Sequence, residues 1–248
     1  ASIMAILSST DIAHPAIEAL FTIDEETGMT GAMALQGGLL HGSIMLNLDT
    51  EDDRELTIGC AGGIDVTGTG NYAAESVSGL AGYKITVNGL TGGHSGMDIH
   101  LGRGNANKLM NRILLQGATQ FGLRILSIDG GSLRNAIPRE SVAVVGVPSD
   151  QKAGFEAFFA QEAATLKAEY KTTDPNLAAT AVACDGPSNS LSADFQTKLL
   201  AVLAACPNGI YRMSPDIAGL VQTSNNLSRV LVKDGNYSLQ CLTRSSVE

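Results

Sequence analysis

The amino-acid sequence predicts two structural parts, an α/β layer with a mostly parallel sheet over residues 1–63 and an α+β sandwich over residues 64–248. Three observations support this. In the first part, continuous apolar segments alternate with short helical ones, as in strands that are buried on both faces of a parallel sheet. After Gly63 the chain becomes small and polar without a clear period. From Tyr83 onward, half-buried strands and amphipathic helices alternate.

The first part contains apolar segments of strand length and two short helical segments. The helices are expected at residues 2–8 and in "TGAMALQGG", which Gly37 and Gly38 would close. Three segments are predicted as strands: "AIEALFTI" (16–23), "SIMLNLDT" (43–50) and "ELTIGCAGG" (55–63).

The second part begins with residues 64–83, which we interpret as a crossing linker or an irregular edge. The end of the chain, "RVLVKDGNYSLQCLTRSS", predicts a hairpin with its turn at Asp234-Gly235. Ser192 opens a helix that Pro207 and Gly209 would stop. Strands are predicted at 83–90, 123–131, 141–148 and 177–184, and helices at 105–121, 153–170 and 192–209.

Composition excludes several classes of protein. With 44% hydrophobic and 17% charged residues, the 248-residue chain can bury a core and is not expected to be disordered. A net charge of −9 argues against a broad nucleic-acid surface, which needs a basic face. No segment approaches the roughly 18 continuous apolar residues of a membrane span. The start lacks both a basic signal-peptide region and an initiator Met, so we expect a chain trimmed or cut from a longer protein.

The four cysteines are widely spaced and form no CxxC pair, which argues against a disulfide scaffold or a cysteine zinc site. We expect buried free thiols in a reducing cytosol. The cysteines are Cys60, Cys184, Cys206 and Cys241.

Two acidic clusters follow predicted strands. One is Asp24-Glu25-Glu26, and the other starts at Asp49 and continues through residues 51–53. In open α/β sheets, ligands gather beyond the carboxyl ends of strands, so the two clusters are candidates to converge on one divalent cation. The alternative is that these acids are solvated loop residues, as most Asp and Glu are.

A third feature is the glycine-rich segment "GLTGGHSGMDIHLGRGNANKL" at residues 89–109. Gly92, Gly93 and Gly96 surround His94, which gives a titratable ring an unusually free backbone. Such a loop suits a group that contacts a ligand. The alternative is a turn with an incidental histidine.

Several motifs, taken in order and spacing, resemble the bacterial aminoacyl-histidine dipeptidases, also called β-alanyl-histidine or cytosol non-specific dipeptidases, of the co-catalytic zinc peptidase superfamily. The resemblance covers nearly the whole chain, and its longest motif is highly specific. The motifs are "LFTIDEETGMTGA", "LNLDTED", "IGCAGG", "GGHSGMDIHLGRGNANKL", "LRNAIPRE", "TSNNL" and "LTRSS".

The resemblance implies that residues 1–63 are part of a catalytic domain of the phosphorylase/hydrolase-like zinc peptidase type. Residues 64–248 would be an α+β lid/dimerisation domain, incomplete at its C-terminus, that forms a homodimer. It implies a cytoplasmic enzyme that hydrolyses unblocked dipeptides of the Xaa-His type with two Zn²⁺ per subunit, or Co²⁺ or Mn²⁺ in their place.

The same resemblance assigns roles to the first acidic residues. Glu26 matches a terminal ligand of one zinc ion and Asp49 a ligand of the other, while Glu25 matches the general acid/base. Adjacent residues in a turn point in different directions, so one can bind a metal while its neighbour faces water. The bridging aspartate and both zinc histidines are expected outside this chain, because His14, His41 and His100 do not lie in ligand contexts.

For the lid, the resemblance places His94 at the oxyanion of a partner's active site. Asn135 and Arg244 would hold the backbone or carboxylate of the dipeptide, with Thr223 and Asn226 as further substrate-binding candidates. Two other readings stay open. One is a related amidohydrolase, such as an aminoacylase or a desuccinylase, and the other is an inactive dimerisation module.

Overall fold

The computed structural model describes residues 2–25, 28–49, 54 and 59–247. Contacts between residues divide the chain into two compact units, Ala1–Ile58 and Gly59–Glu248. This division falls a few residues before the predicted one after Gly63. No helix among the described residues is long and apolar enough to cross a membrane.

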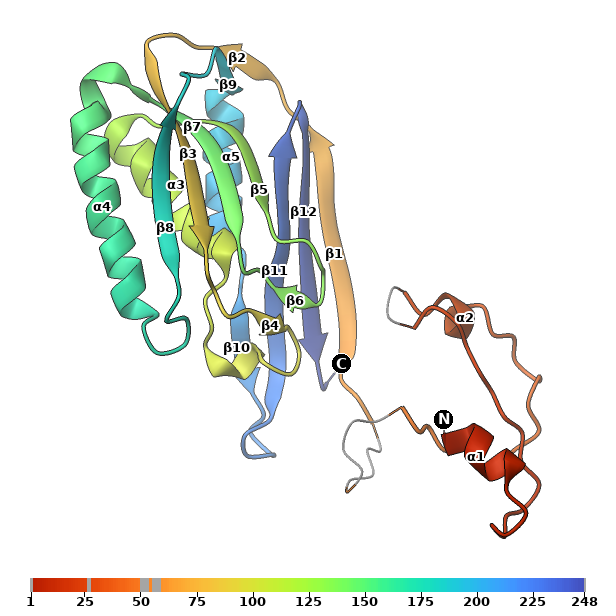
Figure 1. The fold of residues 1–248 in the computed structure, drawn as a ribbon. Coiled ribbons are helices and arrows are strands. Elements are labelled where there is room, and N and C mark those ends of the chain that lie inside the picture. Colours follow the sequence, from red (N-terminus) through yellow and green to blue (C-terminus); the bar gives the residue numbers. More distant parts are fainter. Residues whose placement is uncertain (1, 26–27, 50–53, 55–58, 248) are drawn as a thin grey trace. The chain divides into compact units, whose positions relative to one another are not determined.

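The second unit is built on one antiparallel sheet with strand order β1-β12-β11-β5-β7-β3-β8, and β10 pairs with β11 outside that path (Figure 1). Two small ladders join β2 with β9 and β4 with β6. The strands are β1 (Gly62–Asn71), β2 (Ala74–Ser76), β3 (Leu80–Asn88), β4 (Gly93–His94), β5 (Arg124–Gly130), β6 (Ala136–Ile137), β7 (Ser141–Pro148), β8 (Ala178–Cys184), β9 (Asn189–Leu191), β10 (Gly209–Met213), β11 (Val221–Lys233) and β12 (Asn236–Ser245).

Three helices cover one face of this sheet, as Figure 1 shows. The alternation of β3 explains why: Tyr83, Ile85 and Val87 are buried while Lys84 between them is exposed. Every second side chain of such a strand therefore faces the helices and forms a continuous core with them. The helices are α3 (Ala106–Phe121), α4 (Lys152–Glu169) and α5 (Ala193–Ala205), with short 3₁₀ turns η1 (Ile99–Leu101) and η2 (Ser149–Gln151). The predicted α+β architecture of this part is confirmed.

The hairpin prediction is also confirmed. Lys233 pairs with Asn236 across the turn, and both turn residues have left-handed backbones, with φ 53° at Asp234 and 77° at Gly235. This is the backbone that a two-residue hairpin with matching twist requires, and glycine adopts it without strain.

Of the two interpretations of residues 64–83, the linker is wrong, whereas the edge is correct in position, because β1 is the terminal strand of the sheet. Most of this segment is strand: β1 pairs with β12 along its whole length, from Gly62↔Ser245 to Asn71↔Asn236, and β3 already begins at Leu80. Strand β1 is an exposed edge strand, so no burial pattern selects apolar residues at every second position. Hydrophobic periodicity therefore carried no signal there.

The mostly parallel sheet expected in the first part is also wrong for the described residues. The described residues up to Asp49 contain the helices α1 (Ser2–Ser8) and α2 (Thr30–Met33) and no strand, and α2 is much shorter than expected. Segments 16–23 and 43–49 are not strands, and Ile23 and Ile44 are 73% and 82% exposed. A strand needs a hydrogen-bonded neighbour, and the described part of this unit supplies none. Residues 55–58 lie outside the described residues.

The cysteine prediction is half right. All four thiols are free, but none is buried: Cys60 and Cys184 are exposed, and Cys206 and Cys241 are half-buried. Cys60 precedes the edge strand β1, and Cys184 ends the opposite edge strand β8, so neither position faces the core.

Replacing Asn105 by alanine is expected to cost about 2–3 kcal/mol of unfolding free energy. Asn105 is buried, and its Oδ1 accepts hydrogen bonds from the backbone N–H groups of Asn107 and Lys108 at the start of α3. Its Nδ2 also donates to Asn208 Oδ1 (2.8 Å) and Leu227 O (3.1 Å). The change therefore removes a helix cap and a link between α3 and the sheet.

Ser192→Ala is the matched control, since Ser192 Oγ caps α5 by accepting one hydrogen bond, from Phe195 N. It should cost about 1 kcal/mol. Urea unfolding of both variants measures the difference, with the slope of free energy against urea unchanged. Equal losses in the two variants would show that the link to the sheet contributes nothing.

Candidate active site

His94 lies in a short ladder against the other face of the sheet, the face without helices. Strand β4 pairs with β6 so that His94 is opposite Ala136, and Ser95 N donates to Asn135 O at 2.7 Å. Asn226 Nδ2 donates to Ala136 O at 2.8 Å, which fastens this ladder to β11. Two loops far apart in sequence are thus held together at one end of the sheet.

Glycine is required at the turn before His94. Gly93 has φ 135°, and a Cβ there would lie 2.4 Å from Asp98 Oδ2 and from the Arg103 guanidinium. Those two side chains lock the loop, because Asp98 Oδ2 accepts from His94 N (2.9 Å) and Arg103 Nη1 donates to Gly92 O (2.6 Å). The histidine is therefore held in a fixed loop.

The surroundings of His94 define its tautomer. Its Nδ1 lies 3.2 Å from Gly96 N and 3.1 Å from Met97 N, and both backbone N–H groups donate to it. A nitrogen that accepts carries no proton, so the neutral ring carries its proton on Nε2. Burial, and next the positive charge of Arg244, lower the pKa of His94, while Asp98 opposes them. At neutral pH the ring is a neutral Nε2–H donor.

Arg244 lies next to this histidine. A Cβ built on Gly96 would be 3.1 Å from Arg244 Nε and 3.2 Å from His94 Cε1, so both side chains contact the same glycine. Within the described part of the chain, Arg244 has no carboxylate partner, and its Nε is buried without a hydrogen-bond acceptor. The Oγ of Ser95, which is 2% exposed, also lacks a partner there. Unpaired donors beside a neutral imidazole form a site that can accept an anion.

Two other lid candidates, Asn226 and Thr223, lie in β11 and face opposite sides of the sheet. Asn225 donates to Pro207 O just after α5, whereas Asn226 donates to Ala136 O, so the two neighbours point to opposite faces. Arg244 is paired with Ser224 and shares the face of Asn226. Thr223 bonds Ser245 Oγ at 3.1 Å, and by the same alternation it belongs to the helix-covered face.

Asn226 and Asn135 therefore differ in what they can contact. Asn226 is 1% exposed, and both ends of its carboxamide are engaged, by Ala136 O and by Asn105 Nδ2. It can position the β6 ladder but has no surface left for a ligand. Asn135 is exposed, and its carboxamide has no hydrogen-bond partner among the residues the structure describes.

Asp24 and Glu25, the described residues of the first acidic cluster, lie in a turn. Met29 N donates to Asp24 O (2.6 Å), Gly31 N donates to Ile23 O (3.2 Å), and Thr30 Oγ1 donates to Asp24 Oδ2 (2.8 Å). Asp24 has a left-handed backbone, φ 61°, which is strained for a residue other than glycine. Asp24 thus shapes the turn, and Glu25 beside it is exposed.

The predicted metal ligands are covered only in part. Glu26 lies outside the described residues, and Asp49 is exposed, with its backbone N–H bonded to Asn47 Oδ1. Among the described residues, no group of three or more His, Cys, Asp or Glu side chains is placed to hold a metal ion. The described side chains therefore do not make up a zinc site by themselves.

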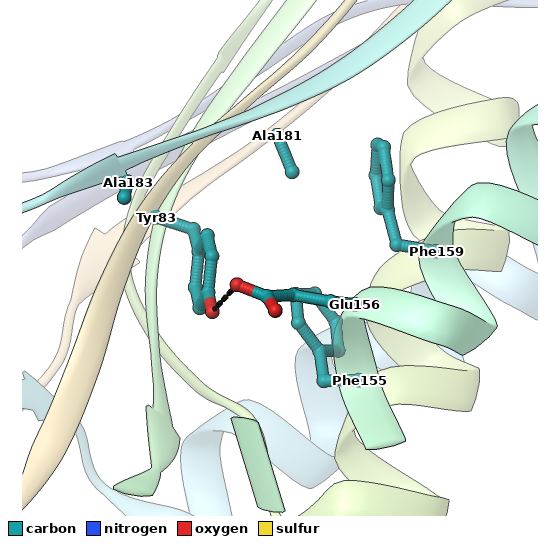
Figure 2. Close-up of a pocket in the computed structure, with 6 residues that line it drawn as sticks. All are labelled: Tyr83, Phe155, Glu156, Phe159, Ala181 and Ala183. Atoms are coloured by element: carbon teal, nitrogen blue, oxygen red, sulfur yellow. Dashed lines mark hydrogen bonds between the residues drawn. The ribbon is translucent and has the colours of Figure 1, made fainter. Parts of the chain in front are cut away.

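A separate hollow lies between β8, β3 and α4, lined by Tyr83, Phe155, Glu156, Phe159, Ala181 and Ala183 (Figure 2). Tyr83 donates its hydroxyl hydrogen to Glu156 Oε1 at 2.8 Å. Burial, followed by Glu156, raises the pKa of Tyr83 to about 12, so the phenol stays protonated. This apolar hollow carries no group suited to hydrolysis and belongs to the packing of α4.

The sequence did not reveal Ser95 as a site residue or Gly96 as the contact between His94 and Arg244. Their signal was present in "GGHSG", since a small residue on each side of a histidine leaves room for a second side chain. The approach of Arg244 to Gly96 in the folded chain shows that this second side chain is Arg244.

Comparison with known proteins agrees with this description. Residues 76–174 match the family model described as a peptidase dimerisation domain. The whole chain is 39% identical to the cytosol non-specific dipeptidase of Escherichia coli (strain K12), of which it covers 51%. It also matches the crystal structure of aminoacylhistidine dipeptidase from Vibrio alginolyticus with a TM-score of 0.82 and 40% identity, again covering all of this chain and 51% of that one.

The chain therefore spans about half the length of these relatives. The match extends over the whole chain. The resemblance to the aminoacyl-histidine and cytosol non-specific dipeptidases is thereby confirmed in sequence and in fold, together with a peptidase dimerisation domain in the second unit.

Proposed function

We propose that this chain is part of a metal-dependent dipeptidase that hydrolyses unblocked dipeptides of the Xaa-His type in the cytoplasm. The observation that carries the proposal is the half-buried Arg244 guanidinium, unpaired within the described residues and adjacent to the Nε2–H donor of His94. A dipeptide presents a carboxylate close to its scissile carbonyl. A bidentate arginine suits the carboxylate, and a neutral N–H donor suits the carbonyl oxygen as negative charge develops.

The lid residues divide into contacting and positioning groups in this proposal. His94, Arg244 and the exposed Asn135 contact the substrate, and Ser95 Oγ is a further donor beside them. Asn226 holds the β6 ladder in place, and Thr223 stabilises the end of the β11–β12 pair through Ser245. The geometry supports this division because only the first group has unused donors.

The catalytic carboxylates are proposed from the resemblance of the motifs "LFTIDEETGMTGA" and "LNLDTED" to the aminoacyl-histidine dipeptidases. Glu25 serves as general acid/base, and Glu26 and Asp49 are ligands in a site for two zinc ions, whose presence would polarise the scissile carbonyl and make water more acidic. Glu25 is exposed beside a fixed turn, which suits a group that takes a proton from water and returns it to the leaving amine.

A homodimer is proposed through the second unit, in keeping with the matched dimerisation domain. Within the part of the chain that the structure describes, the sheet ends at two open edges, β1 and β8. On β8, Val182 is 62% exposed, and on β1, Ile64 and Val66 are 67% and 55% exposed. An open edge with exposed apolar side chains is a ready site for pairing with a second copy. A dimerisation role alone, without catalysis, is the second candidate that this match favours.

Replacing Arg244 by alanine in the protein expressed from the complete reading frame is expected to lower kcat/KM for an unblocked dipeptide about 10- to 100-fold. The loss corresponds to a charge-assisted hydrogen bond of about 1.5–3 kcal/mol. A dipeptide amide lacks the carboxylate, so its slower hydrolysis should change little. Arg244→Lys, which keeps the charge but loses the two-pronged geometry, should be intermediate.

Parallel assays separate the candidate functions. Cleavage of unblocked dipeptides and not of N-acylated amino acids supports the dipeptidase, and the reverse preference supports an aminoacylase or desuccinylase. Equal effects of Arg244→Ala on the acid and the amide would overturn the role of Arg244. A dimeric protein without either activity would support the dimerisation module.

A further inference from the structure

Two half-buried cysteine side chains meet on the helix-covered face of the sheet. Cys206 directly follows α5, and Cys241 lies in β12 opposite Leu227. Their Sγ atoms are 3.4 Å apart. A disulfide bond measures about 2.0 Å, so the two sulfurs need to approach by about 1.4 Å, which rotation of both side chains can share. Cys206 has φ −57° and ψ 120°, outside the helical range, so α5 does not fix its backbone.

The groups around this pair favour the thiolate form of one of the two cysteines. Lys108 Nζ donates to the carbonyl oxygens of Leu203 (2.7 Å), Ala204 (2.9 Å) and Cys206 (2.8 Å), which holds an ammonium group at the end of α5. The hydrogen bond from Cys206, and then Asn225 and Lys108, lower the pKa of Cys241 against the effect of burial. The pKa of Cys206 is raised, chiefly by the same hydrogen bond.

We propose that Cys206 and Cys241 are a redox-active thiol pair that forms a reversible intramolecular disulfide by exchange with a small disulfide such as oxidised glutathione. The Cys241 thiolate attacks one sulfur of glutathione disulfide, the S–S bond breaks, and one glutathione thiolate leaves. The Cys206 thiol then loses its proton to solvent and attacks the Cys241 sulfur, which expels the second glutathione. Two protein thiols are oxidised to one disulfide, and glutathione disulfide is reduced to two thiols.

The pair is connected to the strands that carry the candidate active site. Asn225 Nδ2 donates to Pro207 O at 2.6 Å and lies 3.9 Å from Cys206 Sγ. Its Oδ1 accepts from Thr243 Oγ1 at 2.7 Å, next to Arg244. A disulfide would fasten the end of α5 to β12 three residues before Arg244, and so restrain the strand pair that presents it. The inference does not depend on the proposed hydrolysis.

The test uses the 248-residue chain with Cys60→Ser and Cys184→Ser, which removes the two exposed thiols. After incubation with oxidised glutathione, the intact mass should fall by that of two hydrogen atoms, and both remaining thiols should resist alkylation. Non-reducing peptide mapping should link the peptides of Cys206 and Cys241, and dithiothreitol should reverse the link. Closing this loop should raise the Tm by about 5 °C or more.

Single variants give the matched controls. With Cys206→Ser, Cys241 should accumulate one glutathione adduct, and with Cys241→Ser, Cys206 should do the same, because neither variant can expel the glutathione by closing the disulfide. The same mapping on the chain with all four cysteines guards against a folding defect in the serine variant. Stable glutathione adducts on both cysteines without a link, or no reaction of the folded chain, would overturn the proposal.

Discussion

Replacing Glu25 by glutamine in the protein expressed from the complete reading frame is expected to lower kcat by about 10²–10⁴-fold while the zinc content stays unchanged. A glutamine has nearly the size of a glutamate but cannot take or return a proton. The turn should persist, because it is formed by Asp24, Met29 and Thr30 and not by the Glu25 side chain. The loss should therefore appear in kcat more than in KM.

Glu26→Gln is the neighbouring control, because the proposal gives this residue to the metal. It should lower the zinc content measured by elemental analysis, and activity should return in part when zinc is added in excess. If Glu25→Gln loses zinc while Glu26→Gln keeps full activity, the roles of the two neighbours are reversed. If neither change affects hydrolysis, the carboxylates have no catalytic part.

Burial explains which elements could be predicted from the sequence. Strand β3 and helix α3 have one face in the core, so their apolar residues recur with the period of the element, and the sequence shows it. Strand β1 has no buried face, and its ladder with β12 is made by backbone groups that every residue carries. Its threonines and glycines therefore resembled a linker.

The opposite error occurred in residues 16–23. An apolar run is compatible with a buried strand, but a strand also needs neighbours, which local sequence does not report. The structure leaves Ile23 and Phe21 73% and 60% exposed. The segment is apolar, as its composition shows, but the predicted strand was wrong.

The candidate site was predictable in its residue types but not in its geometry. His94 and Arg244 are 150 residues apart, and their contact depends on the register Ser224↔Arg244 and on the β4–β6 ladder. Asn226 shows the limit of a motif, because nothing in "TSNNL" indicates that both ends of its carboxamide are engaged in the interior. Burial changes such a residue from a candidate ligand contact into a positioning residue.

Replacing His94 by alanine is expected to lower kcat about 10²–10³-fold with a smaller change in KM and no loss of zinc, the usual effect of removing one donor to a developing oxyanion. The backbone donors to Nδ1 leave the proton on Nε2, so the ring is already a donor in its neutral form. His94→Gln, which keeps an N–H donor on a side chain of similar length, should recover part of the loss.

The contribution of His94 to stability depends on pH, because the pKa of its ring is lowered in the folded protein. The pKa of His94 is lowered from 6.5, so the folded protein binds fewer protons at this ring than the unfolded chain. The stability associated with the neutral ring is full above pH 6.5 and is lost as the pH falls through the folded-state pKa. An imidazole titration followed by NMR should place this pKa below 6.5, and Arg244→Ala should raise it, because a positive neighbour is removed.

If the dimer brings His94 to the active site of the partner subunit, two inactive variants should complement each other. A heterodimer of His94→Ala and Glu25→Gln contains one site in which both residues are intact, so mixing the two with demonstrated subunit exchange should restore part of the activity. A mixture of either variant with the double variant His94→Ala/Glu25→Gln contains no such site and is the control. If exchange occurs and activity stays at the parental background, His94 acts within its own subunit or takes no part in the reaction.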